Sequence, residues 1–330
     1  MIQKLPNYSK KETVRLMNQF GSSGTPFVFL VSFSGEDNIL MPVTEAEHKG
    51  FFLEMPGLPI RREVPPPAEP VSISISPVDP QRYREAFEMV TGQILYGNSF
   101  LLNLTFPTRI EINYSLDQIF TGSRAPFKLY IKDELVVFSP ERFIRIRGLD
   151  ISSNPMKGTI DAGIPGAHAK LTSDLKEDAE HNTIVDLIRN DLSMVATQVR
   201  VRRFKYIDRL RTHQGELLQM SSEITGRLPA GFQDALGEVI FKLLPAGSIT
   251  GAPKNKTVEI ILEAEKYNRG YFTGIFGHWD GRNLDSAVAI RYIEKNGTGL
   301  VFKSGGGITF QSSCDREYDE MLKKVYVPIY

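Results

Sequence analysis

The spacing of hydrophobic residues predicts several amphipathic helices. The clearest covers residues 173–196, where apolar positions recur three or four apart from Ile184 to Val195. Ser173 or Asp174 is the expected N-cap of this helix. Further helices are predicted over residues 10–20, 80–95, 231–243, 254–267 and 313–325.

Short apolar or alternating runs bounded by turn residues predict strands. They cover residues 26–33, 101–106, 127–131, 134–139, 143–148, 198–204, 216–225, 271–280, 286–293 and 300–304. These strands come in neighbouring groups and do not alternate strictly with helices, which favours an α+β architecture over a doubly wound sheet. Residues 61–70 contain three consecutive prolines and form the one linker-like stretch.

Composition narrows the class of protein. A chain of 330 residues has room for two domains or one large one, and 41% hydrophobic residues supply a core. The net charge is zero, which argues against nucleic acid as a partner. One cysteine, Cys314, excludes an internal disulfide and favours the cytoplasm. The longest uncharged stretch, residues 89–108, is too polar to span a membrane, and the first residues lack the apolar core of a signal peptide. We therefore expect a soluble cytoplasmic protein.

Two pairs of glutamates stand three residues apart in predicted helices. They are Glu177 with Glu180, and Glu317 with Glu320. Residues three apart share a helix face, so two such faces brought together would form an oxygen-rich site suited to Mg²⁺. The residues alone leave open that both pairs are solvated helix surfaces.

Lys157 lies in the segment NPMKGT (residues 154–159), which we expect to form a tight loop between a strand and a helix. A dry pocket or a nearby metal ion favours the neutral amine of a lysine, and that form is a nucleophile. An ordinary surface lysine is the alternative.

Two glycine-rich segments could bring backbone close to a ligand, GSITGAPK (residues 247–254) and KSGGGI (residues 303–308). Neither matches a P-loop or a dinucleotide fingerprint, and each could be a simple turn. Arg291 lies in an apolar run and suits bidentate binding of a carboxylate. Lys324 could do the same or pair with Glu320 one helical turn before it.

Eight segments, taken in order, resemble the chorismate-utilising enzymes. That family includes anthranilate synthase component I, aminodeoxychorismate synthase component I, isochorismate synthase and salicylate synthase. The segments are SPERF (139–143), PMKGT (155–159), EHNTIVDLIRND (180–191), GSITGAPK, TGIFG (273–277), AIRYI (289–293), KSGGGI and EYDEMLKK (317–324). One such match is weak, but eight in order over residues 95–330 are specific.

The resemblance implies an α+β fold with two facing antiparallel β-sheets and helices packed outside. It implies one chorismate-binding catalytic domain over residues 1–330. Within it, residues 1–70 would be a shortened N-terminal part without the complete tryptophan pocket of longer members.

The resemblance also implies a ligand set. Glu180 and Glu320 would bind Mg²⁺, with Glu177 and Glu317 nearby. The metal would hold the ring carboxylate of chorismate, and Glu141 would support the metal face. The implied substrate contacts are Arg291, Lys324 and the backbone of Gly305 and Gly306 for the enolpyruvyl carboxylate, with Thr250 and Gly251 along the pocket wall.

Lys157 distinguishes between members of the family. Members that make anthranilate have alanine at its position, and members that make aminodeoxychorismate have lysine. In the mechanism that the resemblance implies, the lysine amine attacks C2 of chorismate, the C4 hydroxyl leaves, and ammonia attacks C4 and displaces the lysine. Leu101 stands where the isochorismate and salicylate makers have a lysine base, so amination fits better than hydroxylation.

Two positions depart from the aminating members, which usually have glutamine at Leu101 and histidine at Gln219. Glutamine can hydrogen-bond the departing hydroxyl but is no acid near neutral pH. His213, six residues upstream, could replace that histidine only if the strand bulges. Cys314 does not lie in the glycine-rich elbow of a glutaminase, so ammonia would come from a separate glutamine amidotransferase subunit or from free ammonium.

The resemblance therefore implies an aminodeoxychorismate synthase component I, which would make 4-amino-4-deoxychorismate for 4-aminobenzoate and folate synthesis. The alternatives are an anthranilate synthase component I with an atypical lysine and a non-catalytic chorismate-binding subunit.

Overall fold

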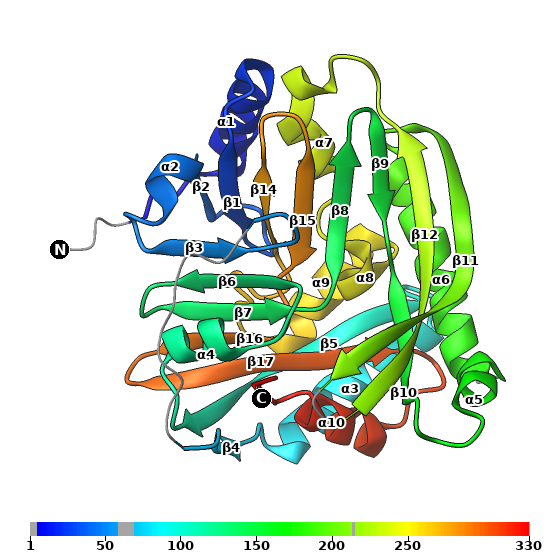
Figure 1. The fold of residues 1–330 in the computed structure, drawn as a ribbon. Helices are drawn as coiled ribbons and strands as arrows, with labels where there is room; N and C mark the ends of the chain where they lie inside the picture. The colour runs from blue at the N-terminus through cyan, green and yellow to red at the C-terminus, as the bar shows by residue number, and fades with distance from the viewer. Residues whose placement is uncertain (1–4, 59–68, 174, 213–214, 330) are drawn as a thin grey trace.

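The computed structural model describes residues 5–58, 69–173, 175–212 and 215–329 (Figure 1). Side chains are not described at residues 157–159, 175–177, 210–212, 215 and 217. Asp174, His213 and most of the proline-rich linker therefore lie outside the described residues. No helix in the described part of the chain is long and apolar enough to cross a membrane.

The described residues form two antiparallel sheets. The first has nine strands, in the order β10 (Met156–Asp161), β12 (Gly215–Arg227), β9 (Asp150–Ser153), β8 (Arg142–Arg147), β15 (Leu284–Val288), β14 (Ile275–Trp279), β1 (Phe27–Val31) and β2 (Asn38–Pro42), with β11 (Thr197–Thr212) on the outer side of β12. The second has eight, in the order β13 (Gly251–Ala252), β5 (Leu101–Ile112), β17 (Gly299–Ile308), β16 (Tyr292–Asn296), β7 (Leu135–Ser139), β6 (Phe127–Ile131) and β3 (Phe51–Glu54), with β4 (Ile73–Ser76) beside β5.

The two sheets face one another across a hydrophobic core, and their strands run nearly at right angles in Figure 1. Because side chains alternate along a strand, β1 divides its residues between two cores. Val28 and Leu30 pack between the sheets with Leu129 and Val137. Phe29 points the other way, into the core beneath the helices that cover the first sheet. The predicted α+β class and facing antiparallel sheets are confirmed.

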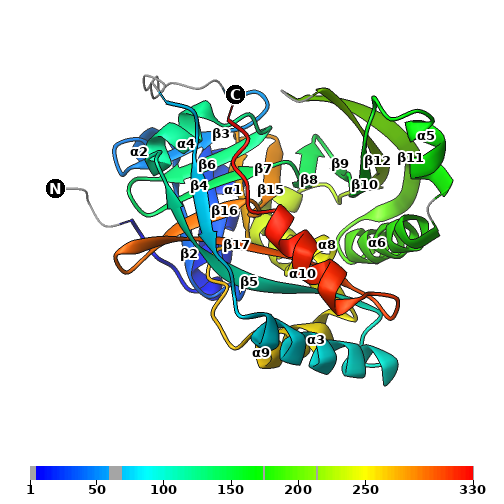
Figure 2. The ribbon, with the colours of Figure 1, turned by 90° about the horizontal axis from the view of Figure 1, so that it is seen from below.

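Helices cover the outer faces of the sheets. The first sheet is covered by α1 (Lys10–Ser23), α6 (Leu175–Ser193), η1 (Phe232–Ala235) and α7 (Leu236–Lys242). The second is covered by α3 (Pro80–Leu95), α4 (Leu116–Gly122), α9 (Lys254–Glu265) and α10 (Cys314–Lys323). Shorter helices are α2 (Val43–Ala46), α5 (Ala167–Ser173) and α8 (Gly247–Thr250). Figure 2 shows α3 and α9 side by side below β5, and α6 beside β11 and β12.

Several predicted elements differ in detail from the structure, among them the following three. The helix over 173–196 is α6, which begins at Leu175 and follows the separate helix α5. The strand over 286–293 is two strands, because Arg291 adopts a positive φ of 55° where the chain crosses from one sheet to the other. The segment KSGGGI is no turn but the second half of β17.

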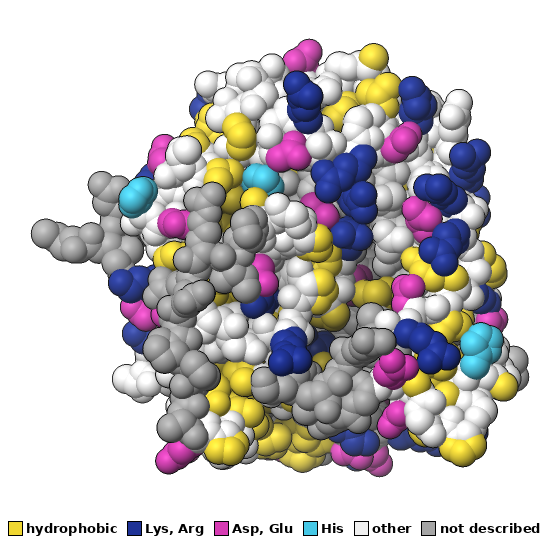
Figure 3. Space-filling view, in the orientation of Figure 1, with side chains coloured by type: hydrophobic (Ala, Val, Ile, Leu, Met, Phe, Trp, Pro, Cys, Tyr) yellow, Lys and Arg dark blue, Asp and Glu magenta, His cyan; other side chains and the backbone are white. Residues whose placement is uncertain are grey.

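The strand β11 forms an outer edge of the first sheet. An open edge can pair with another chain, and bulges and charges oppose such pairing. The register between β11 and β12 shifts at three points, and Arg200, Arg202 and Arg203 are exposed. Charged side chains of both signs are interspersed over this side of Figure 3, in keeping with the zero net charge.

Candidate active site

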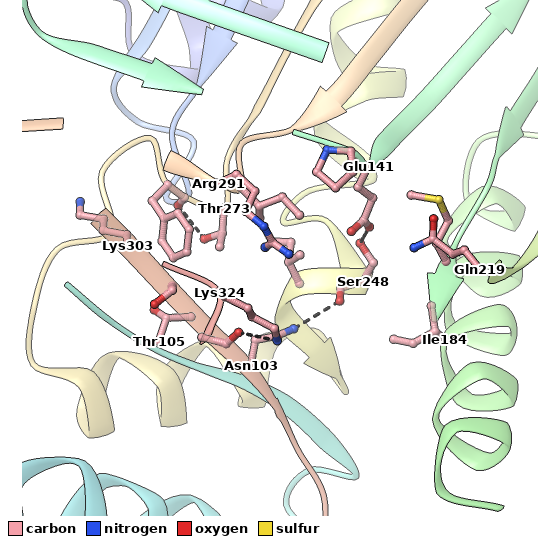
Figure 4. Close-up of a pocket in the computed structure, with 17 residues that line it drawn as sticks. Asn103, Thr105, Glu141, Ile184, Gln219, Ser248, Thr273, Arg291, Lys303 and Lys324 are labelled. Atoms are coloured by element: carbon pink, nitrogen blue, oxygen red, sulfur yellow. Dashed lines mark hydrogen bonds between the residues drawn. The ribbon is translucent and has the colours of Figure 1, made fainter. Parts of the chain in front are cut away.

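A cavity of about 200 Å³ lies where the two sheets meet α6 and the end of α10 (Figure 4). This volume equals that of about seven molecules of liquid water, enough for a small ring compound. Five predicted site residues line it, although they are far apart in the sequence: Glu141, Gln219, Arg291, Gly305 and Lys324. Sequence analysis missed others that line it: Asn103, Thr105, Met156, Ile184, Ser248, Thr273 and Lys303.

Neighbouring strands β5 and β17 form one wall of the cavity. Along this ladder Asn103 pairs with Gly307, Thr105 with Gly305 and Pro107 with Lys303. Asn103, Thr105, Lys303 and Gly305 all line the cavity. A Cβ atom on Gly305 would lie 2.3 Å from the carbonyl oxygen of Leu104, so the two backbones are close enough that only glycine fits. The wall therefore presents backbone to the cavity at this point.

Arg291 is the cation at the centre of the cavity. Figure 4 shows its guanidinium pointing into the space near Glu141 and Thr273. Its Nε is buried without a hydrogen-bond partner in the described structure, and the ring of Tyr326 lies 5.5 Å from its guanidinium carbon. A guanidinium with open donors suits a substrate carboxylate. The positive φ of Arg291 is strained backbone, which is typical of functional sites.

The end of α10 brings charged groups of both signs to Gly306. Lys324 Nζ lies 2.8 Å from Glu320 Oε1 and donates to the carbonyl oxygen of Gly305 at 3.0 Å. Oxygens of Glu317 and Glu320 both lie within 4 Å of the point that a Cβ on Gly306 would occupy. Glu317 is buried and accepts a hydrogen bond from Ser312 at 2.7 Å. Two carboxylates thus meet beside a backbone glycine.

Glu141 is oriented by the segment GSITGAPK. The hydroxyl of Ser248 donates to Glu141 Oε1 at 2.5 Å, and Asn103 Nδ2 donates to the Ser248 carbonyl at 3.2 Å. Thr250 and Gly251 are not among the described residues that line this cavity. Thr250 is buried and donates to Ala246, and Gly251 packs its backbone against Leu101. Their predicted contact with substrate stays a prediction.

Lys157 lies in β10 and not in the predicted loop. The sheet register pairs Lys157 with Met220 and Thr159 with Gln219, with a shift between the two pairs. The backbone of Lys157 is therefore beside two cavity residues, its chain neighbour Met156 and the cross-strand Gln219. The side chains of Lys157 and Glu177 lie outside the described part of the structure, as does His213.

A second cavity of about 450 Å³ is lined partly by the same elements, β5 and α6. Leu101 precedes Asn103 on β5, Glu180 lies one turn before Ile184 on α6, and Thr309 follows β17. Phe100 and Phe310 make its walls apolar. Glu180 thus lines this second cavity, while Glu317 and Glu320 lie beside Gly306 of β17.

The acidic residues allow a test of the predicted Mg²⁺ site. Among the described side chains no group of three or more histidines, cysteines or acids could hold a metal ion. Mg²⁺ is commonly held by one or two carboxylates together with water and a ligand. The Glu317 and Glu320 carboxylates near Gly306 fit that requirement. The Mg²⁺ site itself stays a prediction.

Lys303 is a buried cation at the edge of the cavity. Its Nζ lies 2.7 Å from Glu294 Oε1 and donates to the carbonyl oxygen of Arg269 at 2.9 Å. Burial lowers the pKa of Lys303, and the attraction of Glu294 opposes this in part. Because these acceptors hold the ammonium, Lys303 stabilises the wall of the cavity and is poorly placed to bind a ligand.

Residues 35–329 match the family described as chorismate binding enzyme. The chain belongs to this family. An uncharacterised PabA-like protein of Haemophilus influenzae is 47% identical over 314 residues, which are 94% of this chain and 95% of that protein. Aminodeoxychorismate synthase component 1 of Bacillus subtilis is 30% identical over 310 residues, 89% of this chain and 64% of that one.

Solved structures agree on the fold of this chorismate-binding enzyme. Anthranilate synthase component I of Streptococcus pneumoniae is 25% identical, with a TM-score of 0.65 over 78% of this chain and 59% of that one. The menaquinone-specific isochorismate synthase of Escherichia coli has a TM-score of 0.74 over 97% of this chain and 82% of that one. At 17% identity, the second likeness shows the fold alone.

Proposed function

We propose that this chorismate-binding enzyme is an aminodeoxychorismate synthase component I. It would convert chorismate and ammonia to 4-amino-4-deoxychorismate, a precursor of 4-aminobenzoate and folate. The observation that carries the proposal is Lys157 in the segment PMKGT, on a strand whose neighbours Met156 and Gln219 line the cavity. The Bacillus subtilis relative of that name supports the same activity.

The charges of the cavity suit the two carboxylates of chorismate. Arg291, with its buried Nε donor open, would bind the enolpyruvyl carboxylate together with Lys324 and the backbone at Gly305 and Gly306. Lys324 already contacts Gly305, so its ammonium is held at the place where this carboxylate would lie. This arrangement would fix the ring with its C2 and C4 edge toward β10 and β12.

Glu317 and Glu320 would hold Mg²⁺ at Gly306, with Glu180 approaching from α6 and Glu177 nearby. When bound, the ion would neutralise the ring carboxylate of chorismate and fix its position. Oxygen ligands of this kind suit a hard cation such as Mg²⁺.

The chemistry would proceed by two displacements. The neutral amine of Lys157 forms a bond to C2, and the C4 hydroxyl departs with a proton as water. Ammonia then forms a bond to C4 and the Lys157 amine leaves C2. Glu141 is the one carboxyl group among the described residues lining the cavity. We therefore assign it the role of general acid, which gives a proton to the departing hydroxyl. Gln219 would hydrogen-bond that hydroxyl.

Ammonia would come from a separate glutamine amidotransferase subunit or from free ammonium. A glutaminase nucleophile needs a thiol with a lowered pKa. Burial instead raises the pKa of Cys314, the single cysteine, at the first turn of α10. This thiol is therefore a poor candidate for releasing ammonia from glutamine.

The test is the product of the reaction. The protein is incubated with chorismate, Mg²⁺ and ammonium, a 4-amino-4-deoxychorismate lyase is added, and the aromatic products are separated. We expect 4-aminobenzoate from the wild type and from Lys170→Ala, an exposed lysine on α5, and none from Lys157→Ala. Without ammonia, intact mass should show a covalent adduct on Lys157. Anthranilate as the product would refute the proposal.

A second candidate is anthranilate synthase component I, favoured by the structural likeness to the Streptococcus pneumoniae enzyme. In that case Lys157→Ala would keep full activity and the product would be anthranilate. The departures at Leu101 and Gln219 motivate a third, a non-catalytic chorismate-binding subunit. It would bind chorismate without turnover at every ammonium concentration, also with a glutaminase subunit present.

A further inference from the structure

A fully buried ion pair lies behind the cavity wall. Arg269 Nη2 lies 2.6 Å from Glu265 Oε1, and Arg269 Nε donates to Glu265 Oε2 at 2.9 Å. The two side chains are 0% and 1% exposed. Removing two charges from water commonly costs more free energy than their attraction recovers, so a buried ion pair is weak evidence of a stabilising role. The groups that this pair orients indicate its role more clearly.

The other hydrogen bonds made by these two side chains go to three residues that line the cavity. Glu265 Oε1 accepts from both the backbone N–H and the hydroxyl of Thr105, at 2.8 and 2.9 Å. Arg269 donates to the Asn103 carbonyl at 2.7 Å and to the Thr273 hydroxyl at 3.2 Å. Thr105, Asn103 and Thr273 all line the cavity. One ion pair therefore touches the cavity wall at four points.

The pair fills a gap in the sheet. Along the side of β5 that faces away from β17, β13 pairs only with residues 101–102 and β4 only with residues 109–112. Between them no described strand pairs with this edge. The Asn103 carbonyl and the Thr105 N–H would be buried there without partners, which is costly. Glu265 and Arg269 take the place of the missing strand.

The same pair also reaches the segment that carries Arg291. Thr273 donates its backbone N–H to Ala289 at 2.8 Å, and Ala289 donates to Gly274 at 2.8 Å. Ala289 lies two residues before Arg291, at the crossing between the sheets. The ion pair thus connects the β5 wall to the crossing segment on the other side of the cavity.

We propose that Glu265 and Arg269 are positioning residues that fix the width of the substrate cavity. They hold Asn103 and Thr105 on one side and Thr273 on the other at a set spacing, and touch no substrate themselves. The inference rests on the proposed function in one respect, because chorismate is the ligand whose Kd and KM are used to detect a change in the cavity.

Removing one partner would leave a buried charge and can unfold the chain, so both are replaced. The variant is Glu265→Leu with Arg269→Met, which keeps the side-chain volume roughly constant. The matched control is Glu54→Leu with Lys128→Met, a second pair with Lys128 Nζ 2.6 Å from Glu54 Oε2 on strands β3 and β6. That pair lines neither cavity.

Melting temperature, chorismate affinity by calorimetry, KM and kcat are measured for each protein. We expect the Glu265/Arg269 variant to fold with a lower melting temperature, because the Asn103 carbonyl and the Thr105 N–H lose their partners. It should also raise KM and the chorismate Kd about tenfold or more, because small displacements of positioning groups weaken binding and catalysis strongly. The control should stay within about twofold of the wild type. A purely structural role would lower the melting temperature and leave KM unchanged.

Arg269→Lys provides a second variant if the double variant does not fold. It keeps the charge opposite Glu265 but lacks the fork that reaches Asn103 and Thr273 together, so KM should rise about three- to tenfold. A folded variant of either kind with wild-type KM and Kd would overturn the inference while the proposed function stands. A wild-type chain that neither binds nor converts chorismate would refute the proposed function, and with it this role.

Discussion

Gly305→Ala is expected to separate the two strands β5 and β17 at the cavity. The new Cβ would lie 2.3 Å from the Leu104 carbonyl oxygen and 2.7 Å from the Thr105 Cα. Carbon and oxygen normally approach to about 3.3 Å, so β5 and β17 must part by about 1 Å. Overpacking of this kind costs about 1–3 kcal/mol, and a weakened ladder hydrogen bond adds about 1 kcal/mol. The free energy of unfolding should therefore fall by about 2–4 kcal/mol.

The expected fall in melting temperature follows from the size of the chain. Unfolding entropy is about 2.1 cal/mol/K per residue, or about 0.7 kcal/mol/K for this protein, so the midpoint should drop by about 3–6 °C. Activity should drop further, because Gly305 lines the cavity and accepts from Lys324. A shift of about 1 Å can cost about a hundredfold in rate.

Gly306→Ala is the matched control for this prediction. Its Cβ would meet Glu317, Lys324 and Glu320 at 3.4–3.9 Å, which is ordinary van der Waals contact. Its melting temperature, measured by calorimetry beside Gly305→Ala, should equal that of the wild type or exceed it slightly, because alanine restricts the unfolded chain. Equal melting temperatures for the two variants would refute the close-approach reasoning.

Three further predictions concern charged groups around the cavity. Burial lowers the pKa of Lys303 below 10.5. Between the lowered value and 10.5 the unfolded chain binds more protons than the folded one, so the free energy of unfolding rises with pH. Lys303→Met should remove this rise, measured by urea unfolding at a series of pH values. Tyr326→Ala should raise KM for chorismate about two- to fivefold by removing the ring beside Arg291, while Tyr326→Phe should not. Glu320→Gln should raise the Mg²⁺ concentration for half-maximal activity more than tenfold, whereas the exposed Glu36→Gln should not.

The amphipathic pattern was sufficient to find most helices, because each buries one face. The spans of α3 and β6 agree with the prediction residue for residue. The family resemblance also singled out Glu141, Gln219 and Arg291, which line one cavity. Glu141 and Arg291 lie in short connections between strands, and Gln219 lies within β12.

The parts that local sequence did not reveal depend on tertiary contacts. The run AVAIRYI has strand propensity throughout, yet Arg291 adopts a positive φ because the chain changes sheets there. The strand β5 continues past Pro107 to Ile112. Pro107 is tolerated because, like Thr105 two residues before it, it turns its backbone nitrogen away from β17. The Glu265–Arg269 pair completes that same edge, which no spacing rule would have indicated.

The pairing of β5 with β17 joins residues 200 positions apart, Thr105 with Gly305. At ribosomal rates of about 5–20 residues per second, β5 would wait about 10–40 s for this partner during synthesis. Over that interval the apolar strand would have an open edge on the nascent chain, where it is prone to pair with other chains. The yield of folded protein should therefore increase with chaperones and at lower growth temperatures, even if the folded protein is stable. A ligand of the cavity could not assist this step, because the wall that β5 and β17 form together does not exist until β17 has been made.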